Sequence, residues 1–207
     1  MKVADRLLRI LRTRILGTAI LGLLGCSVFF AVQVERRRRS LQLTEEGDFK
    51  AGDVVRVVAP IDGDEISVED AVGRRTVVRL LGLRTFEPSI NDPAVGPHGQ
   101  RAFEHISQLV GRQVAVFPGD PARDSRQRLL AYVEDGQVEP PLDVALEMIR
   151  QGLGVAYTEF GHPREVAYLA AEVEAARNRA GVWADEALVK RIEARKAAWQ
   201  ERRRQRP

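Results

Sequence analysis

Short runs of apolar residues, separated by turn-forming residues, predict five strands between residues 54 and 133. The first two are rich in Val and Ile, at 54–58 and 66–68, and the intervening 60–63 (Pro-Ile-Asp-Gly) predicts a break. A third strand at 76–83 follows a predicted hairpin turn at 71–74. Two further strands are predicted at 114–117 and 129–133. Their lengths are typical of a small sheet or barrel.

Three segments have the apolar spacing of a helix. They cover 99–110, 142–151 and 165–179, and Gly152 and Gly181 end the second and third. Prolines at 88, 93 and 97 predict an irregular loop before the first helix. The order β-β-β-α-β-β-α-α contains no βαβ repeat. It favours a mainly β, α+β domain over 52–183: a five-stranded, partly open OB-fold barrel with about three helices.

Residues 15–34 form an uncharged apolar run that predicts one transmembrane helix. Twenty helical residues span about 30 Å, the thickness of the hydrocarbon core of a bilayer. A basic tail (1–14) precedes the run, and a linker (35–51) with four arginines at 36–39 follows it. A cleaved signal peptide and a lipoprotein acylated at Cys26 are the alternatives. The apolar run continues through Val32, beyond Cys26, which favours the membrane-spanning helix over both.

Basic charge lies at the two ends of the chain. Residues 1–50 carry a net charge of +5 and 184–207 carry +4, whereas 51–183 carries −6. This distribution argues against a binder that spreads positive charge over its nucleic-acid-binding domain. A positive N-terminal tail is hard to translocate, which favours a single-pass protein with its domain on the extracytoplasmic side. The basic, helix-like C-terminal tail (184–207) is predicted to be solvated or, alternatively, to contact anionic lipid headgroups.

The cysteine and histidine content limits the metal and disulfide chemistry. Cys26 is the only cysteine, so no intramolecular disulfide partner and no cysteine-based metal site are expected. His98, His105 and His162 have no spacing typical of zinc ligands.

Three stretches of the predicted domain carry candidate chemistry. They are a carboxylate-rich turn at 62–65 (Asp-Gly-Asp-Glu), the run 79–87 (Arg-Leu-Leu-Gly-Leu-Arg-Thr-Phe-Glu) and the run 124–132 (Asp-Ser-Arg-Gln-Arg-Leu-Leu-Ala-Tyr). In the last two, Arg79 and Arg128 enter apolar strands. A guanidinium there costs desolvation free energy unless an anion meets it. The anion is either a carboxylate of the domain or a phosphate, which the guanidinium fork binds through two oxygens.

The order of these stretches resembles the staphylococcal-nuclease-like, or thermonuclease, family. The family pattern has an Asp-Gly-Asp-Thr turn, then Arg-Leu-Leu-x-x-Asp-Thr-Pro-Glu, then Tyr-Gly-Arg-x-Leu-Ala-Tyr. The resemblance continues at 96–97 (Gly-Pro), 150–153 (Arg-Gln-Gly-Leu) and 181–183 (Gly-Val-Trp), so it covers about 54–183. It implies an OB barrel that hydrolyses phosphodiester bonds of DNA or RNA with calcium.

The resemblance also implies roles for individual residues. Arg79 and Arg128 would hold the cleaved phosphate and stabilise its developing charge, and Glu87 would position or deprotonate the attacking water. Asp64 would be a calcium ligand, and Thr85 would offer its backbone carbonyl. Tyr157 matches a tyrosine that packs on the nucleotide, or is a core residue.

Departures from the family pattern bear on the calcium site. Arg84 stands where the family has its second metal-binding aspartate, Glu65 replaces the threonine of the turn, and Phe86 replaces the proline. Calcium takes several oxygen ligands, mainly carboxylates. Arg84 therefore predicts an impaired calcium site unless Glu65 compensates, and strand alternation would place Glu65 on the face opposite Asp64. Two hypotheses remain: a membrane-tethered nuclease with a modified metal site, and a catalytically inactive OB-fold binding or scaffold module.

Overall fold

The computed structural model describes residues 49–88 and 91–206. The predicted basic tail 1–14, the predicted transmembrane helix 15–34, Cys26 and most of the predicted linker lie outside these residues. No helix within the described ranges is long and apolar enough to span a bilayer.

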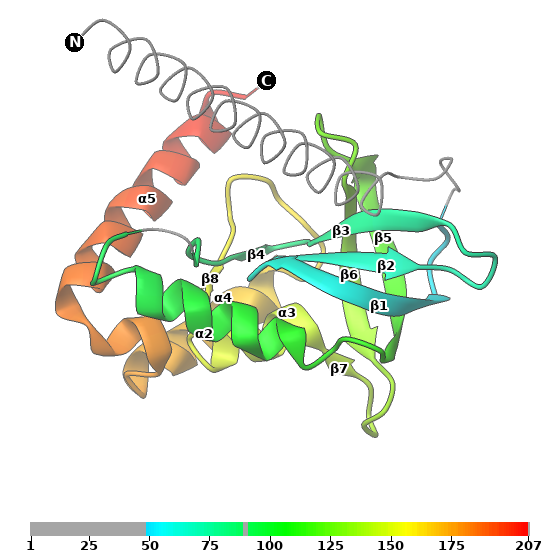
Figure 1. Cartoon of the computed structure of the whole chain (residues 1–207). Helices are drawn as coiled ribbons and strands as arrows, with labels where there is room; N and C mark the ends of the chain where they lie inside the picture. The colour runs from blue at the N-terminus through cyan, green and yellow to red at the C-terminus, as the bar shows by residue number, and fades with distance from the viewer. Residues whose placement is uncertain (1–48, 89–90, 207) are drawn as a thin grey trace, which may run out of the picture. The chain divides into compact units, whose positions relative to one another are not determined.

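The described residues form a mixed α+β fold around a closed five-stranded barrel, which is consistent with an OB fold (Figure 1). The barrel strands are β1 (Asp53–Asp62), β2 (Glu65–Glu69), β3 (Arg75–Leu80), β5 (Gln113–Arg123) and β6 (Leu129–Asp135). Their order in the sheet is β3-β2-β1-β5-β6, and β7 (Leu142–Asp143) continues the sheet beside β6. Parallel pairing of β3 with β6 closes the barrel that the sequence predicts to be partly open.

The predicted boundaries of three strands are wrong. The strand predicted at 114–117 is longer and extends over Gln113–Arg123. The first strand continues through Pro60 to Asp62, because irregular pairing between Val57 and Asp62 accommodates the proline. The third predicted strand divides into β3 and β4 (Leu83–Arg84), and β4 pairs with β8 (Val155–Ala156). The division falls at Gly82, whose φ of +79° favours glycine. A Cβ there would also lie 2.6 Å from the ring of His162.

Helices surround the barrel. They are α2 (Gly96–Ser107), α3 (Val144–Arg150), α4 (Glu165–Arg177) and α5 (Glu186–Arg204), with a short 3-10 helix at Gly181–Ala184. The first three confirm the three predicted helices, although α2 begins three residues earlier than expected. Helix α2 contacts β1, and α3 lies between β6 and α4. The main core lies inside the barrel and under these helices, and Val57, Ile66 and Met148 are completely buried in it.

Helix α5 packs against the domain through a second hydrophobic cluster. Leu188, Ile192 and Trp199 of α5 are buried against Phe86, Val95, Val155 and Val182. In Figure 1 this helix lies at the end of the barrel where β4 and β8 pair. The C-terminal segment 184–207, which the sequence predicts to be a solvated tail, is therefore packed onto the domain through α5. It contacts the loop after β4, which directly follows Arg84.

Candidate functional site

Strand register brings the two predicted arginines together. Arg79 on β3 pairs with Glu65 on β2 and with Leu130 on β6, and Arg128 directly precedes β6. The Arg79 Nη1 atom donates a hydrogen bond of 2.5 Å to Glu65 Oε1, and Arg128 Nη1 donates to the same oxygen. Two guanidinium groups from different strands therefore meet at one negatively charged oxygen.

Asp124 orients Arg128, a role that the sequence analysis missed. Its Oδ2 accepts a hydrogen bond of 2.8 Å from Arg128 Nε, and its Oδ1 accepts from the backbone N–H groups of Arg126 and Arg128. Burial alone would raise the pKa of Asp124, but the hydrogen bonds from Arg128 hold it below its usual value. The signal was present in the sequence, since an aspartate four residues before the arginine can close a turn around it.

Asp64 is the most buried carboxylate of the site, with 1% of its surface exposed. Its Oδ2 accepts hydrogen bonds from Arg79 Nη2 at 3.0 Å and from the backbone N–H of Thr85 at 3.2 Å. Its Oδ1 has no hydrogen-bond partner among the described residues. Burial raises the pKa of Asp64, and the charges of Arg79 and Arg84 oppose that shift without cancelling it.

The expectation that Glu65 faces away from Asp64 is wrong. Both carboxylates contact Arg79, and carboxylate oxygens of Asp62, Asp64 and Glu65 lie within 4.8 Å of one another. The reason is that Asp64 lies in the turn and β2 begins only at Glu65, so strand alternation does not relate the two. Asp62 is the third member, and the sequence analysis gave it no role although it belongs to the same turn.

The acidic turn fits a hard cation in the kind of ligand that it offers. It presents three carboxylates, and the unpartnered Oδ1 of Asp64 is a free acceptor. Positive charge nearby opposes a cation: Arg84 Nη1 lies 3.9 Å from Asp64 Oδ2, and two guanidinium groups already meet Glu65. Asp62, Asp64 and Glu65 are thus candidate ligands surrounded by arginines.

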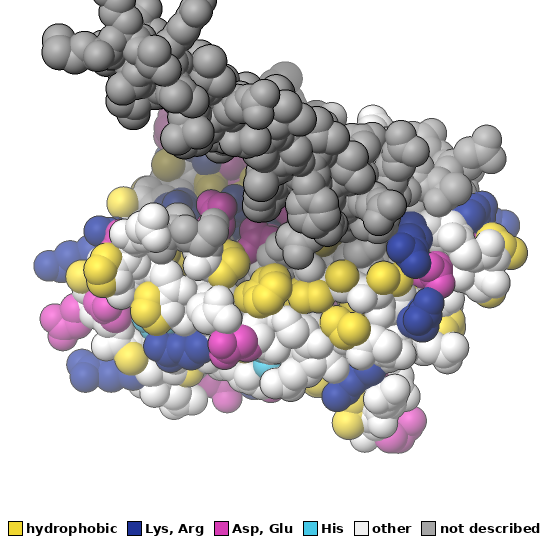
Figure 2. All heavy atoms as spheres, viewed as in Figure 1, with side chains coloured by type: hydrophobic (Ala, Val, Ile, Leu, Met, Phe, Trp, Pro, Cys, Tyr) yellow, Lys and Arg dark blue, Asp and Glu magenta, His cyan; other side chains and the backbone are white. Residues whose placement is uncertain are grey.

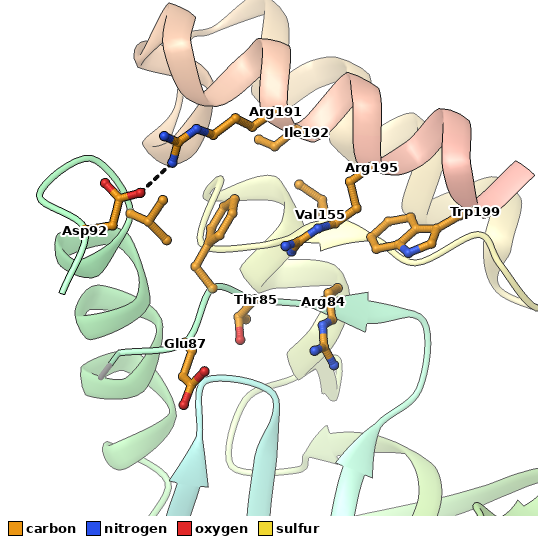
Figure 3. Close-up of a pocket in the computed structure, with 11 residues that line it drawn as sticks. Arg84, Thr85, Glu87, Asp92, Val155, Arg191, Ile192, Arg195 and Trp199 are labelled. Carbon is orange, nitrogen blue, oxygen red and sulfur yellow. Dashed lines mark hydrogen bonds and ion pairs between the residues drawn. The ribbon is translucent and has the colours of Figure 1, made fainter. Parts of the chain in front are cut away.

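Glu87 lies on the segment that runs from β4 to α2. Gly99 lets α2 approach this segment closely, because a Cβ at Gly99 would lie 2.7 Å from the Glu87 carbonyl oxygen. The exposed Glu87 side chain lines a cavity with Arg84 and Thr85, whereas Arg79 and Arg128 do not line it. Figure 3 shows Glu87 and Arg84 extending from the segment on the side away from α5.

Tyr157 lies in the second hydrophobic cluster. Its ring stacks edge-on against Trp199 of α5, with 4.8 Å between centroids. Burial raises its pKa, and the neighbouring Glu159 raises it further. The tyrosine therefore has a packing role beside the cavity.

The surface around the site carries charges of both signs. On the face shown in Figure 2, Lys and Arg side chains alternate with Asp and Glu, and apolar side chains form a band between them. The exposed apolar residues of β1 are Val54 and Ile61. An anionic ligand would therefore be recognised locally, at the arginines, and not by this face as a whole.

Comparison with known proteins identifies relatives of the domain. The family model described as "Staphylococcal nuclease homologue" matches residues 77–185. A protein named "Probable endonuclease LCL3" from Scheffersomyces stipitis is 35% identical over 113 residues, which cover 52% of this chain and 47% of that protein. A "Micrococcal nuclease" from Shigella flexneri is 32% identical over 145 residues, covering 67% of this chain and 75% of the relative. An "Uncharacterized endonuclease" from Haemophilus influenzae is 31% identical over 130 residues, covering 63% and 66%. The chain thus spans about half the length of the first of these relatives.

Proposed function

The chain belongs to the family of staphylococcal nuclease homologues, and from this premise we propose that it hydrolyses phosphodiester bonds of DNA or RNA. The observation that carries the proposal is the meeting of Arg79 and Arg128 at a single oxygen, Glu65 Oε1. A phosphate oxygen of the substrate would take the place of that carboxylate oxygen. Two guanidinium forks would then stabilise the charge that develops on the phosphate during attack.

The remaining roles are those that the resemblance to the family implies. Glu87 positions or deprotonates the attacking water, for which its exposed carboxylate is suited. Asp64, with Asp62 and Glu65, would hold a calcium ion, and a bound calcium supplies positive charge that polarises the phosphate. Thr85 fixes the orientation of Asp64 through its backbone N–H.

We further propose that the calcium site is impaired by Arg84. A positive charge 3.9 Å from Asp64 Oδ2 opposes a cation there. The Coulomb energy between two unit charges about 4 Å apart is about 4 kcal/mol at an effective dielectric of 20. The Arg84 side chain is 43% exposed, so solvent reduces this energy considerably. We therefore expect weak calcium binding and weak calcium-dependent cleavage.

A second candidate function is a binding or scaffold module without turnover. The observation in its favour is that Glu65, which stands where the family pattern has threonine, pairs with both arginines. A substrate phosphate must displace this carboxylate before it can bind. An acidic neighbour that holds the arginines is compatible with a domain that keeps the fold but not the activity.

We also propose that a single helix at 15–34 anchors the protein in a membrane, with the domain on the extracytoplasmic side. The uncharged run of twenty residues and the arginines at both of its ends support the anchor.

A nuclease assay with the full-length chain in detergent tests the main proposal. Single-stranded DNA and RNA are incubated with calcium or with a chelator, and calcium binding is titrated on the same sample. We expect slow calcium-dependent cleavage that Arg79→Ala and Glu87→Ala each reduce about 100-fold or more. Glu104→Ala removes an exposed glutamate of α2 and should leave the rate unchanged. Cleavage that is absent, or equal in all variants, would favour the binding module.

A further inference from the structure

A cavity of about 260 Å³ lies between α5 and the segment that follows β4. Phe86, Val155 and Trp199 contribute apolar side chains to its lining, and Arg84, Arg191 and Arg195 line it as well. The guanidinium of Arg84 turns away from α5, toward Asp64 (Figure 3). The volume is slightly below the range of about 300–1,000 Å³ that is typical of small-molecule sites. It suits a phosphate with its sugar better than a whole cofactor.

The three arginines of the cavity differ in their partners. Arg191 forms an ion pair of 2.6 Å with Asp92, and this pair joins α5 to the loop before α2 (Figure 3). Among the residues that the structure describes, Arg84 approaches one carboxylate, that of Asp64, at 3.9 Å. Arg195 has no carboxylate within 4.0 Å among the described residues, and its guanidinium lies 5.8 Å from the centroid of the Phe86 ring. Arg195 thus holds an exposed positive charge against an aromatic wall.

The cavity adjoins the proposed reaction site through one residue. Arg84 lines the cavity and also approaches Asp64 of the acidic turn. Thr85 and Glu87, on the same short segment, line the cavity as well. Figure 3 shows Arg195 extending from α5 toward this segment. A nucleic-acid strand held at Arg79 and Arg128 would pass Arg84 to bring a neighbouring phosphate to Arg195.

We infer that this cavity is a second phosphate subsite, in which Arg195 binds a phosphodiester group that flanks the cleaved bond, and that Arg84 lies between this subsite and the acidic turn. The ligand class is a single strand of DNA or RNA, because a charged groove with aromatic walls is the arrangement that binds a strand without reading its sequence. The inference rests on the proposed function, since it takes nucleic acid as the substrate. It gives α5 a part in binding the substrate.

Fluorescence anisotropy of the full-length chain in detergent tests the subsite. The probe is a fluorescein-labelled oligothymidine of about ten nucleotides, within the range of about 4–16 that a single OB fold covers. A chelator is present so that no metal-dependent cleavage occurs. The test variant is Arg195→Gln. The matched control is Arg204→Gln, which removes one charge from the same helix at a side chain that is 72% exposed and does not line the cavity.

We expect Arg195→Gln to raise the Kd at least about fivefold, the effect of one charge-assisted hydrogen bond. The control should change it less than twofold. Arg195→Lys, which keeps the charge but loses the fork, should give an intermediate value. Inorganic phosphate should compete with the oligonucleotide less well for Arg195→Gln than for the control. Equal Kd values for test and control, or no oligonucleotide binding by the unaltered chain, would overturn the subsite.

Cleavage by the same variants separates this inference from the proposed function. If the proteins cleave, Arg195→Gln should raise KM with little change in kcat, because it removes binding that is distant from the reacting atoms. Equal cleavage and equal binding by Arg195→Gln and Arg204→Gln would reject the subsite and leave the hydrolysis proposal intact. Selective loss of binding without any cleavage would reject hydrolysis and support the subsite. Thermal unfolding of each variant checks that the fold is unchanged.

Discussion

Two neighbouring carboxylates of the acidic turn have different electrostatic surroundings. Asp64 is almost completely buried, and its Oδ1 lacks a hydrogen-bond partner among the described residues. Glu65 is partly exposed and accepts hydrogen bonds from two guanidinium groups. Burial of the Asp64 carboxylate costs desolvation free energy. The Glu65 carboxylate instead joins Arg79 on β3 to Arg128 before β6. Replacement of the two carboxylates by the matching amides should therefore have opposite effects on stability.

Asp64→Asn should raise the melting temperature at neutral pH. Because burial raises the pKa of Asp64, the folded state holds this proton more tightly than the unfolded state does. The related stability is fully present below the unfolded pKa of about 3.9 and is lost as pH rises through the folded pKa. The amide removes that loss, and we expect a gain of about 2 °C or more in thermal unfolding at pH 7, for which about 1 kcal/mol suffices.

Glu65→Gln, measured in parallel, should lower the melting temperature, because Arg79 and Arg128 lose their shared anion. The difference between the two variants should shrink at pH 4, where Asp64 is increasingly protonated in both states. A stability loss for Asp64→Asn at neutral pH would contradict the electrostatic account of the turn.

Arg84→Asp should increase calcium affinity about tenfold or more. The substitution removes a guanidinium that lies 3.9 Å from Asp64 and adds a carboxylate ligand. Isothermal titration of the full-length chain with calcium measures it, and Arg101→Asp on α2 is a control for the change of overall charge. Cleavage should rise with affinity if the remaining groups are intact. Unchanged affinity would mean that more than one residue separates this site from a calcium-binding one.

The sequence was sufficient to single out Arg79 and Arg128 as members of one site, but not to predict the local geometry around them. Arg79 and Arg128 were recognisable because each enters an apolar strand, where an uncompensated charge is costly. The side on which Glu65 lies depends on where β2 begins, and residue identity does not define that boundary. Arg195 was not identifiable, since its role depends on how α5 docks.

At the scale of the element, α5 forms one wall of the cavity, to which it contributes Arg191, Ile192, Arg195 and Trp199. Its buried residues Leu188, Ile192 and Trp199 lie four and seven residues apart, which places them on one face of a helix. Asp185 caps its N-terminus by accepting hydrogen bonds from the N–H groups of Ala187 and Leu188. The helix therefore depends on a cap at its start and on an apolar face along its length.

Trp199→Ala should lower the melting temperature by about 6–20 °C. The side chain is 4% exposed, and truncation of a buried tryptophan costs about 3–5 kcal/mol. For a domain of this size each kcal/mol corresponds to about 2–4 °C. Lys190→Ala, at an exposed position of α5, is the control. Thermal unfolding followed by circular dichroism measures both, and a change below about 2 °C for Trp199→Ala would show that α5 does not stabilise the domain.

The strands and the first three helices were predictable because short apolar runs bounded by turn residues, and apolar residues at helical spacing, are clear in this core. The packing of α5 was not, because eight basic residues dominate its 24-residue segment (184–207), and only three of its described apolar residues, Leu188, Ile192 and Trp199, are buried. The spacing of those three was the available signal. The division at Gly82 was not predicted, because the lack of room for a side chain there depends on His162 and Tyr168, far along the chain.

At the scale of the whole molecule, the membrane anchor is a prediction that a deletion tests. Removal of residues 1–39 should release the protein from membranes, because it removes the uncharged run 15–34 and the arginines at both of its ends. The described residues of the domain and of α5 form one compact unit, so the released fragment should unfold cooperatively. Flotation of both forms with liposomes at high salt measures the difference. Flotation of the truncated form with the bilayers would refute the anchor.

The ion pairs between α5 and the domain give the molecule its own counter-ions. Arg202 and Arg206 pair with Glu159, Arg203 with Glu165, and Lys196 with Glu172. The positive C-terminal segment and the acidic domain thus neutralise each other internally. Basic residues that are already paired within the protein neutralise fewer phosphates of a bound polyanion, so fewer of its counter-ions are released. The affinity should therefore fall with rising salt less steeply than the count of basic residues suggests. Salt would instead act within the protein, by screening the pairs that hold α5 in place.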